Sequence, residues 1–273
     1  MSDILIAVGL VSGIGLVSAL LLTAAARFFD VPYDEKRKAI RECLPGINCG
    51  ACGCKGCDDY AEAVASGKAE PSLCIPGGAS AAEKIGDILG VVIPPPKDVV
   101  AFVHCNGNCT ATSVKNIYIG VGTCRAASAI YSGPNSCTYG CLGFGDCAAK
   151  CPADAICMRD GIAHINLDLC VGCGLCETTC PKHIISMIPR KDHTAVMCSN
   201  SDKGGEARKT CKNACIGCKK CEKACPVGAI KVVHNLAEID HSKCNGCGIC
   251  IGECPVGCLK PRTFHASDIA QEV

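Results

Sequence analysis

The chain has 273 residues, of which 29 are Cys; it contains no Trp and only 4% aromatic residues. Its 49% apolar content and formal net charge of +1 exclude a disordered chain, and a pI of about 7.3 gives no support to nucleic-acid binding. Because the Cys fall in tight, repeated clusters, a disulfide framework is also disfavoured. We therefore expect an inorganic group to crosslink an interior that lacks large side chains.

The first predicted element is an apolar helix within residues 1–29. Residues 4–26 carry no charge, and at 1.5 Å per residue they would extend about 35 Å, enough to cross a bilayer. A signal peptide is the alternative interpretation, but the leading residues carry Asp3 and no Lys or Arg. The positive-inside rule then predicts a single-pass anchor in the cell membrane, with the bulk of the chain on the cytoplasmic side. The basic residues that follow the run are Arg27, Lys36, Arg37, Lys38 and Arg41.

A small helical domain is predicted for residues 30–93, with helices over 58–66 and from Ser80 onward. Its four clustered thiols belong to Cys49, Cys52, Cys57 and Cys74. Their spacing alone does not separate a zinc site from an iron–sulfur site. Residues 94–97, which include three Pro, are predicted to form a stiff linker to the next part of the chain.

Three later stretches repeat the run C-x2-C-x2-C-x3-C-P, which is the signature of bacterial ferredoxin clusters. They begin at Cys170, Cys215 and Cys244, and a looser version begins at Cys137. In such a run three Cys hold one cluster, and the fourth reaches the cluster of the partner loop. Zinc is again the alternative, but zinc sites commonly use two C-x2-C pairs or combine Cys with His. The repeated spacing therefore favours [4Fe–4S] clusters, and it tilts the first domain towards iron as well.

An internal duplication relates these stretches. Nine Cys within residues 124–180 map onto another Cys when 74 is added to their numbers. The one gap is Phe144, which stands where the second copy has Cys218. We therefore expect an α+β fold in which two ferredoxin-like units, residues 94–189 and 190–273, follow the helical domain. Short strands such as 162–166 and 230–233 are predicted around the cluster loops.

Crossed ligation assigns four sets of Cys in the two units. The sets are Cys215, Cys218, Cys221 and Cys254; Cys225, Cys244, Cys247 and Cys250; Cys151, Cys170, Cys173 and Cys176; and Cys137, Cys141, Cys147 and Cys180. The last set uses Cys137 because the first copy has no Cys at position 144. With the first domain, the sequence predicts five [4Fe–4S] clusters.

Nine Cys remain, and the default expectation for each is a small buried hydrophobic residue. The duplication nevertheless pairs Cys124 with Cys198 and Cys137 with Cys211. This pairing suggests a possible sixth site that joins the two copies. The hypothesis places it at Cys105, Cys124, Cys198 and Cys211.

No catalytic residues are predicted. The chain has no G-x-G-x-x-G after a strand and no Walker loop, so neither flavin nor NAD is expected on it. The seven His are scattered, and none falls in an arrangement with a nucleophile. The chemistry expected of this chain is one-electron transfer.

Taken together, the chain resembles the B subunit of the Rnf complex, the ion-translocating ferredoxin:NAD oxidoreductase of bacterial membranes. The features that carry the resemblance are the charge-free N-terminal run, the motif over residues 48–57 with Cys74, and the ferredoxin repeats; residues 137–147 resemble the long form of the family. One departure is Cys54, an extra thiol in the first motif. The resemblance implies that electrons enter from reduced ferredoxin and pass on to membrane and flavin-bearing subunits. Other subunits would reduce NAD and move Na⁺ or H⁺.

A docking surface for ferredoxin follows from charge. Five clusters would move the formal charge from +1 to about −9, and ferredoxins are themselves acidic, so docking needs a local basic patch. The densest one surrounds Lys219 and Lys220; a solvated charged loop is the alternative. Two other functions stay open: a membrane-bound polyferredoxin that serves a hydrogenase or a bifurcating dehydrogenase, and a structural zinc scaffold.

Overall fold

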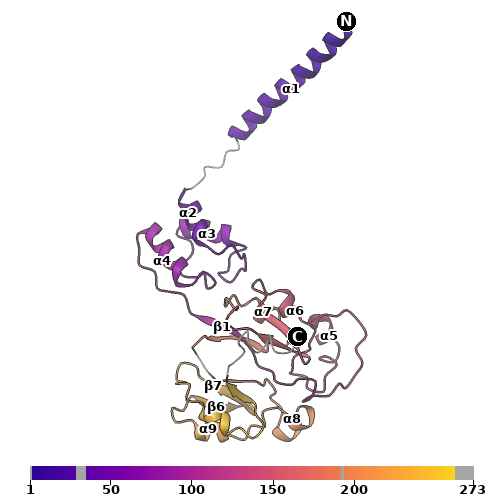
Figure 1. The fold of residues 1–273 in the computed structure, drawn as a ribbon, viewed down its shortest axis with the longest axis vertical. Coiled ribbons are helices and arrows are strands. Elements are labelled where there is room, and N and C mark those ends of the chain that lie inside the picture. The colour runs from indigo at the N-terminus through magenta and orange to yellow at the C-terminus, as the bar shows by residue number, and fades with distance from the viewer. Residues whose placement is uncertain (1, 29–34, 192–193, 262–273) are drawn as a thin grey trace.

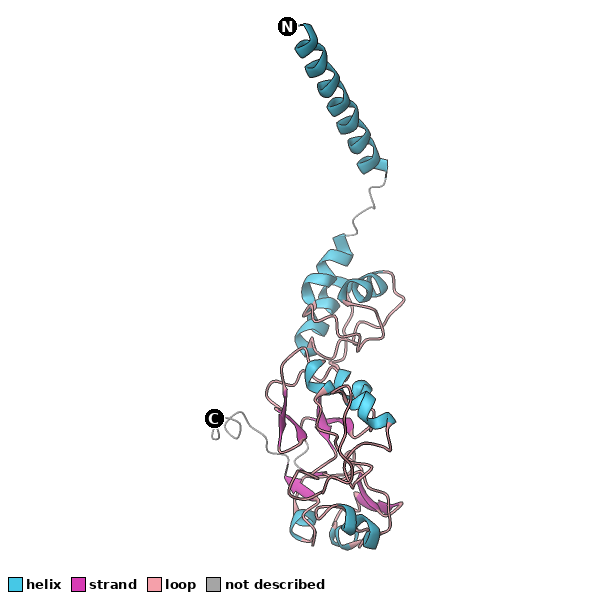
Figure 2. Ribbon diagram, turned by 90° about the vertical axis from the view of Figure 1, so that its right-hand side faces the viewer, coloured by secondary structure: helices cyan, strands magenta, loops and turns pink. Residues whose placement is uncertain are grey.

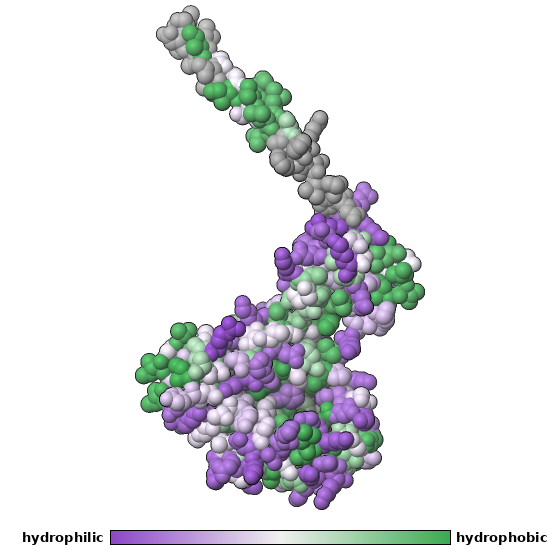
Figure 3. Space-filling view, turned by 180° about the vertical axis from the view of Figure 1, so that it is seen from behind, coloured by the Kyte–Doolittle hydropathy of each residue, from purple (hydrophilic) through white to green (hydrophobic). Residues whose placement is uncertain are grey.

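The computed structural model describes residues 2–28, 35–191 and 194–261. Helix α1 (Ser2–Phe28) covers the charge-free run, and its apolar side chains Leu20, Leu21 and Leu22 are 61–70% exposed. Figure 3 shows these apolar atoms along the helix. In the part of the chain that the structure describes, no helix meets the combined length and apolarity required to cross a bilayer. The predicted membrane span is therefore not confirmed.

Three helices, α2 (Glu35–Cys43), α3 (Cys57–Ala65) and α4 (Gly78–Leu89), form a bundle beside the strand-containing region (Figures 1 and 2). They pack around one fully buried side chain each, Ile40, Tyr60 and Ile85. Helix α4 ends at Gly90, whose φ of +71° is the left-handed conformation that glycine adopts without strain. Helices α3 and α4 confirm the two helices predicted here.

The first ferredoxin-like copy consists of a hairpin, a second antiparallel strand pair and short helices. The hairpin joins β2 (Ile156–Arg159) to β3 (Ile162–Ile165), and the second pair joins β1 (Val99–Val103) to β4 (Ile185–Pro189). The helices are α5 (Cys124–Ala129), α6 (Asp146–Ala149) and α7 (Leu175–Thr179).

The second copy repeats this plan. Its hairpin joins β6 (Ile230–Val233) to β7 (Leu236–Ile239), and its other pair joins β5 (Thr194–Val196) to β8 (Leu259–Pro261). The helices are α8 (Gly204–Thr210), α9 (Lys220–Ala224) and α10 (Ile249–Gly252). The pair Ile156–Ile165 in the first hairpin recurs as Ile230–Ile239 in the second, where both residue numbers are larger by 74. The duplication inferred from the sequence therefore extends to strand register.

The offset of 74 fails at the first strand of each copy. Val103 pairs with Ile185 on β4, and Val196 pairs with Leu259 on β8. The numbers of Ile185 and Leu259 differ by 74, whereas those of Val103 and Val196 differ by 93. The first copy is therefore longer by about 19 residues after β1. We call residues 106–136, which contain this extra length, the insertion loop.

The insertion loop is unusual in what it exposes. Its exposed apolar side chains, each at least 68% exposed, include Val114, Ile117, Ile119 and Val121. Apolar surface is visible on this face of the molecule in Figure 3. At its C-terminal side the loop forms α5, whose Ala127 is fully buried. Tyr118 packs edge-on against Phe144, with ring centroids 5.5 Å apart. The loop is thus attached to the first copy at the position where that copy lacks a Cys.

The two copies also share a hydrophobic core. Val100 and Phe102 of β1 pack with Ile188 of β4 and with Ala195 and Met197 of the second copy, and all five are buried. This packing places β1 and β5 close together, so the residues that follow the two strands can meet.

Candidate metal centres

Site I lies in the helical bundle and comprises the four thiols predicted there. Burial raises the pKa of the Cys74 thiol, and Cys57, Cys49 and Cys52 lie near enough to raise it further. The backbone N–H of Cys57 donates to Asn48 Oδ1 at 2.8 Å, which fixes the Cys loop against the start of α3. The structure therefore brings all four predicted thiols together.

Site II comprises Cys151, Cys170, Cys173 and Cys176. Burial raises the pKa of Cys176 to about 12, with further contributions from Cys170 and Cys173. Burial likewise raises the pKa of Cys173, and Cys151 and Cys170 are among the neighbouring thiols. These four predicted thiols also lie together.

Sites IV and V lie in the second copy. At site IV, burial raises the pKa of Cys221 to about 11, with contributions from Cys215, Cys218 and Cys254. At site V, burial raises the pKa of Cys250, and its neighbouring thiols are Cys244, Cys247 and Cys225. Both predicted sets are therefore assembled, with the fourth Cys crossing over from the partner run.

A backbone contact recurs at three of the four Cys that precede a Pro. Ala155 N–H donates to the sulfur of Cys151 at 3.3 Å, and the same bond at 3.3 Å runs from Ala229 to Cys225. Cys258 N–H makes it to Cys254, again at 3.3 Å. Such N–H···S bonds stabilise a thiolate, which is the form that a metal requires.

Site III, in the first copy, differs from the prediction. Its cavity is lined by Cys124, Cys141, Cys147 and Cys180. Burial raises the pKa of Cys147 to about 12, and the thiols that add to it are Cys141, Cys124 and Cys180. Cys137, which the sequence analysis placed here, does not line this cavity.

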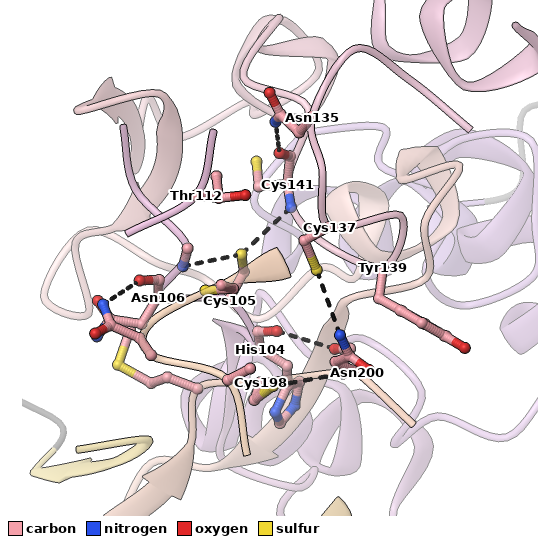
Figure 4. Close-up of a pocket in the computed structure, with 17 residues that line it drawn as sticks. His104, Cys105, Asn106, Thr112, Asn135, Cys137, Tyr139, Cys141, Cys198 and Asn200 are labelled. Atoms are coloured by element: carbon pink, nitrogen blue, oxygen red, sulfur yellow. Dashed lines mark hydrogen bonds between the residues drawn. The ribbon is translucent and has the colours of Figure 1, made fainter. Parts of the chain in front are cut away.

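Cys137 instead lines a separate cavity between the two copies (Figure 4). The other Cys residues that line this interface cavity are Cys105, Cys198 and Cys211, together with Cys141, which also lines the cavity of site III. Two predicted assignments are therefore reversed. Cys124, predicted for the sixth site, lines site III, and Cys137, predicted for site III, lines the interface cavity. The match of Cys124 to Cys198 is a coincidence of numbering, because Cys124 belongs to the insertion loop.

The insertion loop holds Cys124 through capping contacts. Thr123 Oγ1 accepts from Ala126 N–H at 3.2 Å. The Asp146 carboxylate accepts from Cys124 N–H at 2.9 Å and from Arg125 N–H at 3.1 Å. These bonds join the start of α5 to the start of α6, and they set Cys124 beside the residues around Phe144. The missing Cys at position 144 was the sequence signal that another residue had to complete this site.

The donor chemistry of the five sites is thiol only. Within residues 2–28, 35–191 and 194–261, no three His, Cys, Asp or Glu side chains converge closely enough to hold a single metal ion. A cubane places each thiolate on a different iron, so its ligands stand further apart than those of one ion. Four thiols around a small cavity, as at site III, fit that wider arrangement, and soft thiolates suit iron–sulfur clusters.

The predicted docking residues lie on the surface of the second copy. Lys219 and Lys220 are exposed, and so is the neighbouring Cys218 of site IV. Lys219 has a φ of +59° at the N-terminus of α9. The basic residues near them are exposed as well: Lys203, Arg208, Lys209, Lys212 and Lys223.

Three family models match the chain. Residues 44–76 match a putative Fe–S cluster family, residues 163–186 a 4Fe–4S binding domain, and residues 214–258 a 4Fe–4S dicluster domain. These segments include Cys of sites I, II, IV and V, and Cys180 of site III. Neither Cys124 nor any thiol of the interface cavity falls within them.

Curated relatives match over most of their length. The chain is 41% identical to the B subunit of the Na⁺-translocating ferredoxin:NAD⁺ oxidoreductase complex of Acetobacterium woodii, over 89% of this chain and 73% of the relative. It is 40% identical to the B subunit of the proton-translocating complex of Clostridium ljungdahlii, over 84% and 81% of the two chains. It is 36% identical to the B subunit of the ion-translocating oxidoreductase complex of Methanosarcina acetivorans, over 89% and 93%. The chain therefore belongs to the B-subunit family of the Rnf complexes.

Proposed function

We propose that this subunit accepts electrons from reduced ferredoxin and relays them to partner subunits of a ferredoxin:NAD oxidoreductase coupled to Na⁺ or H⁺ translocation. The observation that carries the proposal is the assembly of five four-thiol sites along one chain, each with at least one buried Cys. Membership of the B-subunit family supports the same role, since the names of the relatives specify ferredoxin, NAD⁺ and ion translocation.

The ligands of the five [4Fe–4S] clusters are proposed as follows: Cys49, Cys52, Cys57 and Cys74 at site I; Cys151, Cys170, Cys173 and Cys176 at site II; Cys124, Cys141, Cys147 and Cys180 at site III; Cys215, Cys218, Cys221 and Cys254 at site IV; and Cys225, Cys244, Cys247 and Cys250 at site V. When bound, such a cluster takes up or gives up one electron without a bond being made or broken. The chain supplies thiolates, excludes water and donates N–H bonds to sulfur, which together set each potential.

Contacts between sites support a relay through the first half of the chain. Cys49 of site I lies near enough to Cys173 of site II to raise its pKa, after the larger effect of burial. Cys147 of site III acts in the same way on Cys176 of site II. Sites I, II and III therefore form a continuous series, with thiols of adjacent sites as neighbours.

The division into domains is part of the proposal. It assigns residues 1–29 to an anchor, 30–93 to the helical domain, and 94–189 and 190–273 to the two ferredoxin-like units. The separate core around Ile40, Tyr60 and Ile85 supports the helical domain. Residues 1, 29–34, 192–193 and 262–273 lie outside the described residues, and so does the boundary proposed between residues 29 and 30.

Attachment to the membrane is proposed to occur through α1, because its run of exposed apolar side chains carries no charge between residues 4 and 26. The bulk of the chain would then lie on the cytoplasmic side. Membranes from cells that make the full chain should retain it after a carbonate wash. A chain that begins at residue 30 should be released, and release of both forms would refute the attachment.

Docking of ferredoxin is proposed at Lys219 and Lys220, since exposed Cys218 brings site IV to the surface beside them. The test reverses both charges, Lys219→Glu with Lys220→Glu. We expect slower reduction by ferredoxin and a weaker dependence of that rate on salt. Lys84→Glu with Lys97→Glu, which changes the same charge at exposed positions elsewhere, is the control. Equal effects of the two double variants would rule out this docking site.

The function is tested by iron and sulfide content and by reduction with ferredoxin. The anaerobically purified full chain should contain at least about twenty irons and bleach in the visible region when reduced ferredoxin is added. Zinc in place of iron would establish the scaffold alternative. Co-purification with a hydrogenase or a bifurcating dehydrogenase, without flavin-bearing membrane subunits, would establish the polyferredoxin alternative.

A further inference from the structure

The interface cavity is built by both copies and lies outside the five sites described above. Five Cys residues line it, and one of them, Cys141, also lines site III. The other four, Cys105, Cys137, Cys198 and Cys211, are each no more than 8% exposed. Cys105 follows β1 and Cys198 follows β5, the two strands that pack together in the shared core. All four are free thiols.

The four thiols form two equivalent pairs. Cys137 and Cys211 are related by the offset of 74, and Cys105 and Cys198 by the offset of 93 that relates β1 to β5. The residue before each member of the second pair donates its backbone N–H to an equivalent carbonyl. His104 donates to Ile184 at 2.7 Å, and Met197 donates to Cys258 at 2.8 Å. Each copy thus contributes one Cys after its first strand and one Cys before its Cys-rich run.

The backbone is arranged around these sulfurs as it is around a bound thiolate. Cys105 Sγ accepts from Gly107 N–H at 3.4 Å and from Cys141 N–H at 3.3 Å. Cys198 Sγ accepts from Asn200 N–H at 3.4 Å and from Cys215 N–H at 3.3 Å. Burial raises the pKa of Cys105 to about 12 and that of Cys198 to about 11, and the two donors to each sulfur, in the same positions in both copies, act against this effect.

The remaining contacts also point to a shared ligand. Asn200, only 1% exposed, directs Nδ2 towards Cys137 Sγ at 3.8 Å (Figure 4). A Cβ added to Gly107 would contact the sulfurs of both Cys211 and Cys105, at 3.4 and 3.5 Å. A Cβ on Gly140 would contact those of Cys105 and Cys137, at 3.5 and 3.7 Å. Glycine at both positions keeps the space between the thiols open.

We propose that Cys105, Cys137, Cys198 and Cys211 hold a sixth [4Fe–4S] cluster, which bridges the two ferredoxin-like units. The proposal rests on the function proposed above, since it assigns this site a place in the same relay. The four proposed ligands are all thiols and line one cavity, and soft thiolates suit iron–sulfur clusters. The correction to the sequence hypothesis is the replacement of Cys124 by Cys137.

The position of the cavity gives the bridge its role. Cys141 donates its N–H to Cys105 while its own thiol lines site III. Cys215 donates its N–H to Cys198 while its thiol belongs to site IV. One residue on each side therefore contacts both the bridge and its neighbour. A cluster bound by these four thiols would supply one-electron transfer between sites III and IV, with no proton transferred and no bond made or broken.

The first test is a count on the full chain. We expect about twenty-four irons and as many sulfides per chain, against about twenty if the cavity holds nothing. A content below about sixteen, or zinc in place of iron, would reject the proposed function itself rather than the bridge alone. A content of about twenty would reject only the bridge.

The second test removes two ligands, one from each copy, with Cys137→Ser and Cys211→Ser. We expect a loss of about four irons, retention of the other five clusters by EPR spin count, and slower electron equilibration between the two units after rapid mixing with reduced ferredoxin. Cys109→Ser is the matched control, because Cys109 is an exposed thiol on the insertion loop outside the cavity. An unchanged iron content in the double variant would overturn the bridge. If that variant fails to fold, the iron count on the unmodified chain still decides.

Discussion

The backbone N–H of Cys124 donates to the Asp146 carboxylate at 2.9 Å, and this bond ties the insertion loop to the helix that carries Cys147. Asp146→Ala should release the start of α5 at a cost of about 1 kcal/mol, the usual value of a lost cap. Iron at site III should then be lost to a chelator about fivefold faster. Lys220→Ala, at the equivalent position in the second copy, is the control and should leave the rate of iron loss unchanged. Equal rates for Asp146→Ala and the unmodified chain would contradict this role for the carboxylate.

Site III can be tested by moving its unusual ligand. Cys124→Ser should leave three thiols and yield a cluster that loses one iron, visible as a new EPR signal in the oxidised protein. Phe144→Cys restores the Cys that the second copy has at Cys218. Adding it to Cys124→Ser should recover the full iron content, since the run then supplies three local ligands. If Cys124→Ser keeps all its iron while Cys137→Ser loses the site III signal, the original sequence prediction was right.

Cys258 should tune the potential of site IV. Its buried thiol lies beside the sulfurs of Cys215 and Cys254 and can donate its one S–H to either; this interaction lowers the pKa of Cys254 to about 5 and that of Cys215 to about 6. Donation to ligated sulfur favours the reduced cluster, so Cys258→Ala should lower the midpoint potential. A hydrogen bond of about 1 kcal/mol corresponds to about 40 mV for one electron.

An EPR-monitored redox titration measures this shift, and the first copy supplies the reciprocal experiment. Ile184 occupies the position equivalent to Cys258 and lines the cavity of site III. Ile184→Cys should therefore raise the midpoint potential at site III. Shifts in the opposite directions would show that the thiol acts through packing or solvent access rather than through its hydrogen bonds.

Gly77 keeps site I open at the start of α4. A Cβ at this position would lie 2.6 Å from the Cβ of Ala81 and 3.1 Å from the sulfur of Cys74. Gly77→Ala should destabilise the helical domain by about 1–3 kcal/mol through overpacking and lower the iron occupancy of site I. Gly205→Ala on α8, where a Cβ meets nothing within 4 Å, is the control. Urea unfolding followed by circular dichroism, with iron content, measures both effects; equal midpoints for the two variants would refute the crowding argument.

The regular parts of the molecule were predictable because their constraints are local in sequence. A run such as the one from Cys244 to Cys254 fixes its own loop, and crossed ligation supplies the fourth thiol. The strands over 162–166 and 230–233 and the helices α3 and α4 followed from equally local patterns, whereas the partner strands of the two hairpins were not predicted. The family was recognised for the same reason, from motifs rather than from long-range contacts.

The ligands of site III and of the interface cavity were not predictable by the same means. A single offset of 74 matched Cys124 to Cys198, but strand pairing shows that Cys105 is the counterpart of Cys198. The usable signal was short: Val103-His104-Cys105 resembles Val196-Met197-Cys198 at an offset of 93. The offsets of 74 and 93 give Cys198 two different counterparts. Only the hydrogen bonds between strands that are distant in the sequence show which counterpart is right.

The interface cavity takes its thiols from positions that extend from Cys105 to Cys211. During synthesis, Cys105 and Cys137 of the first copy therefore leave the ribosome before Cys198 and Cys211 of the second copy. Biogenesis of the protein must protect Cys105 and Cys137 from oxidation over that interval. A half-length chain would present an unmatched thiol pair, and only the joined copies enclose it.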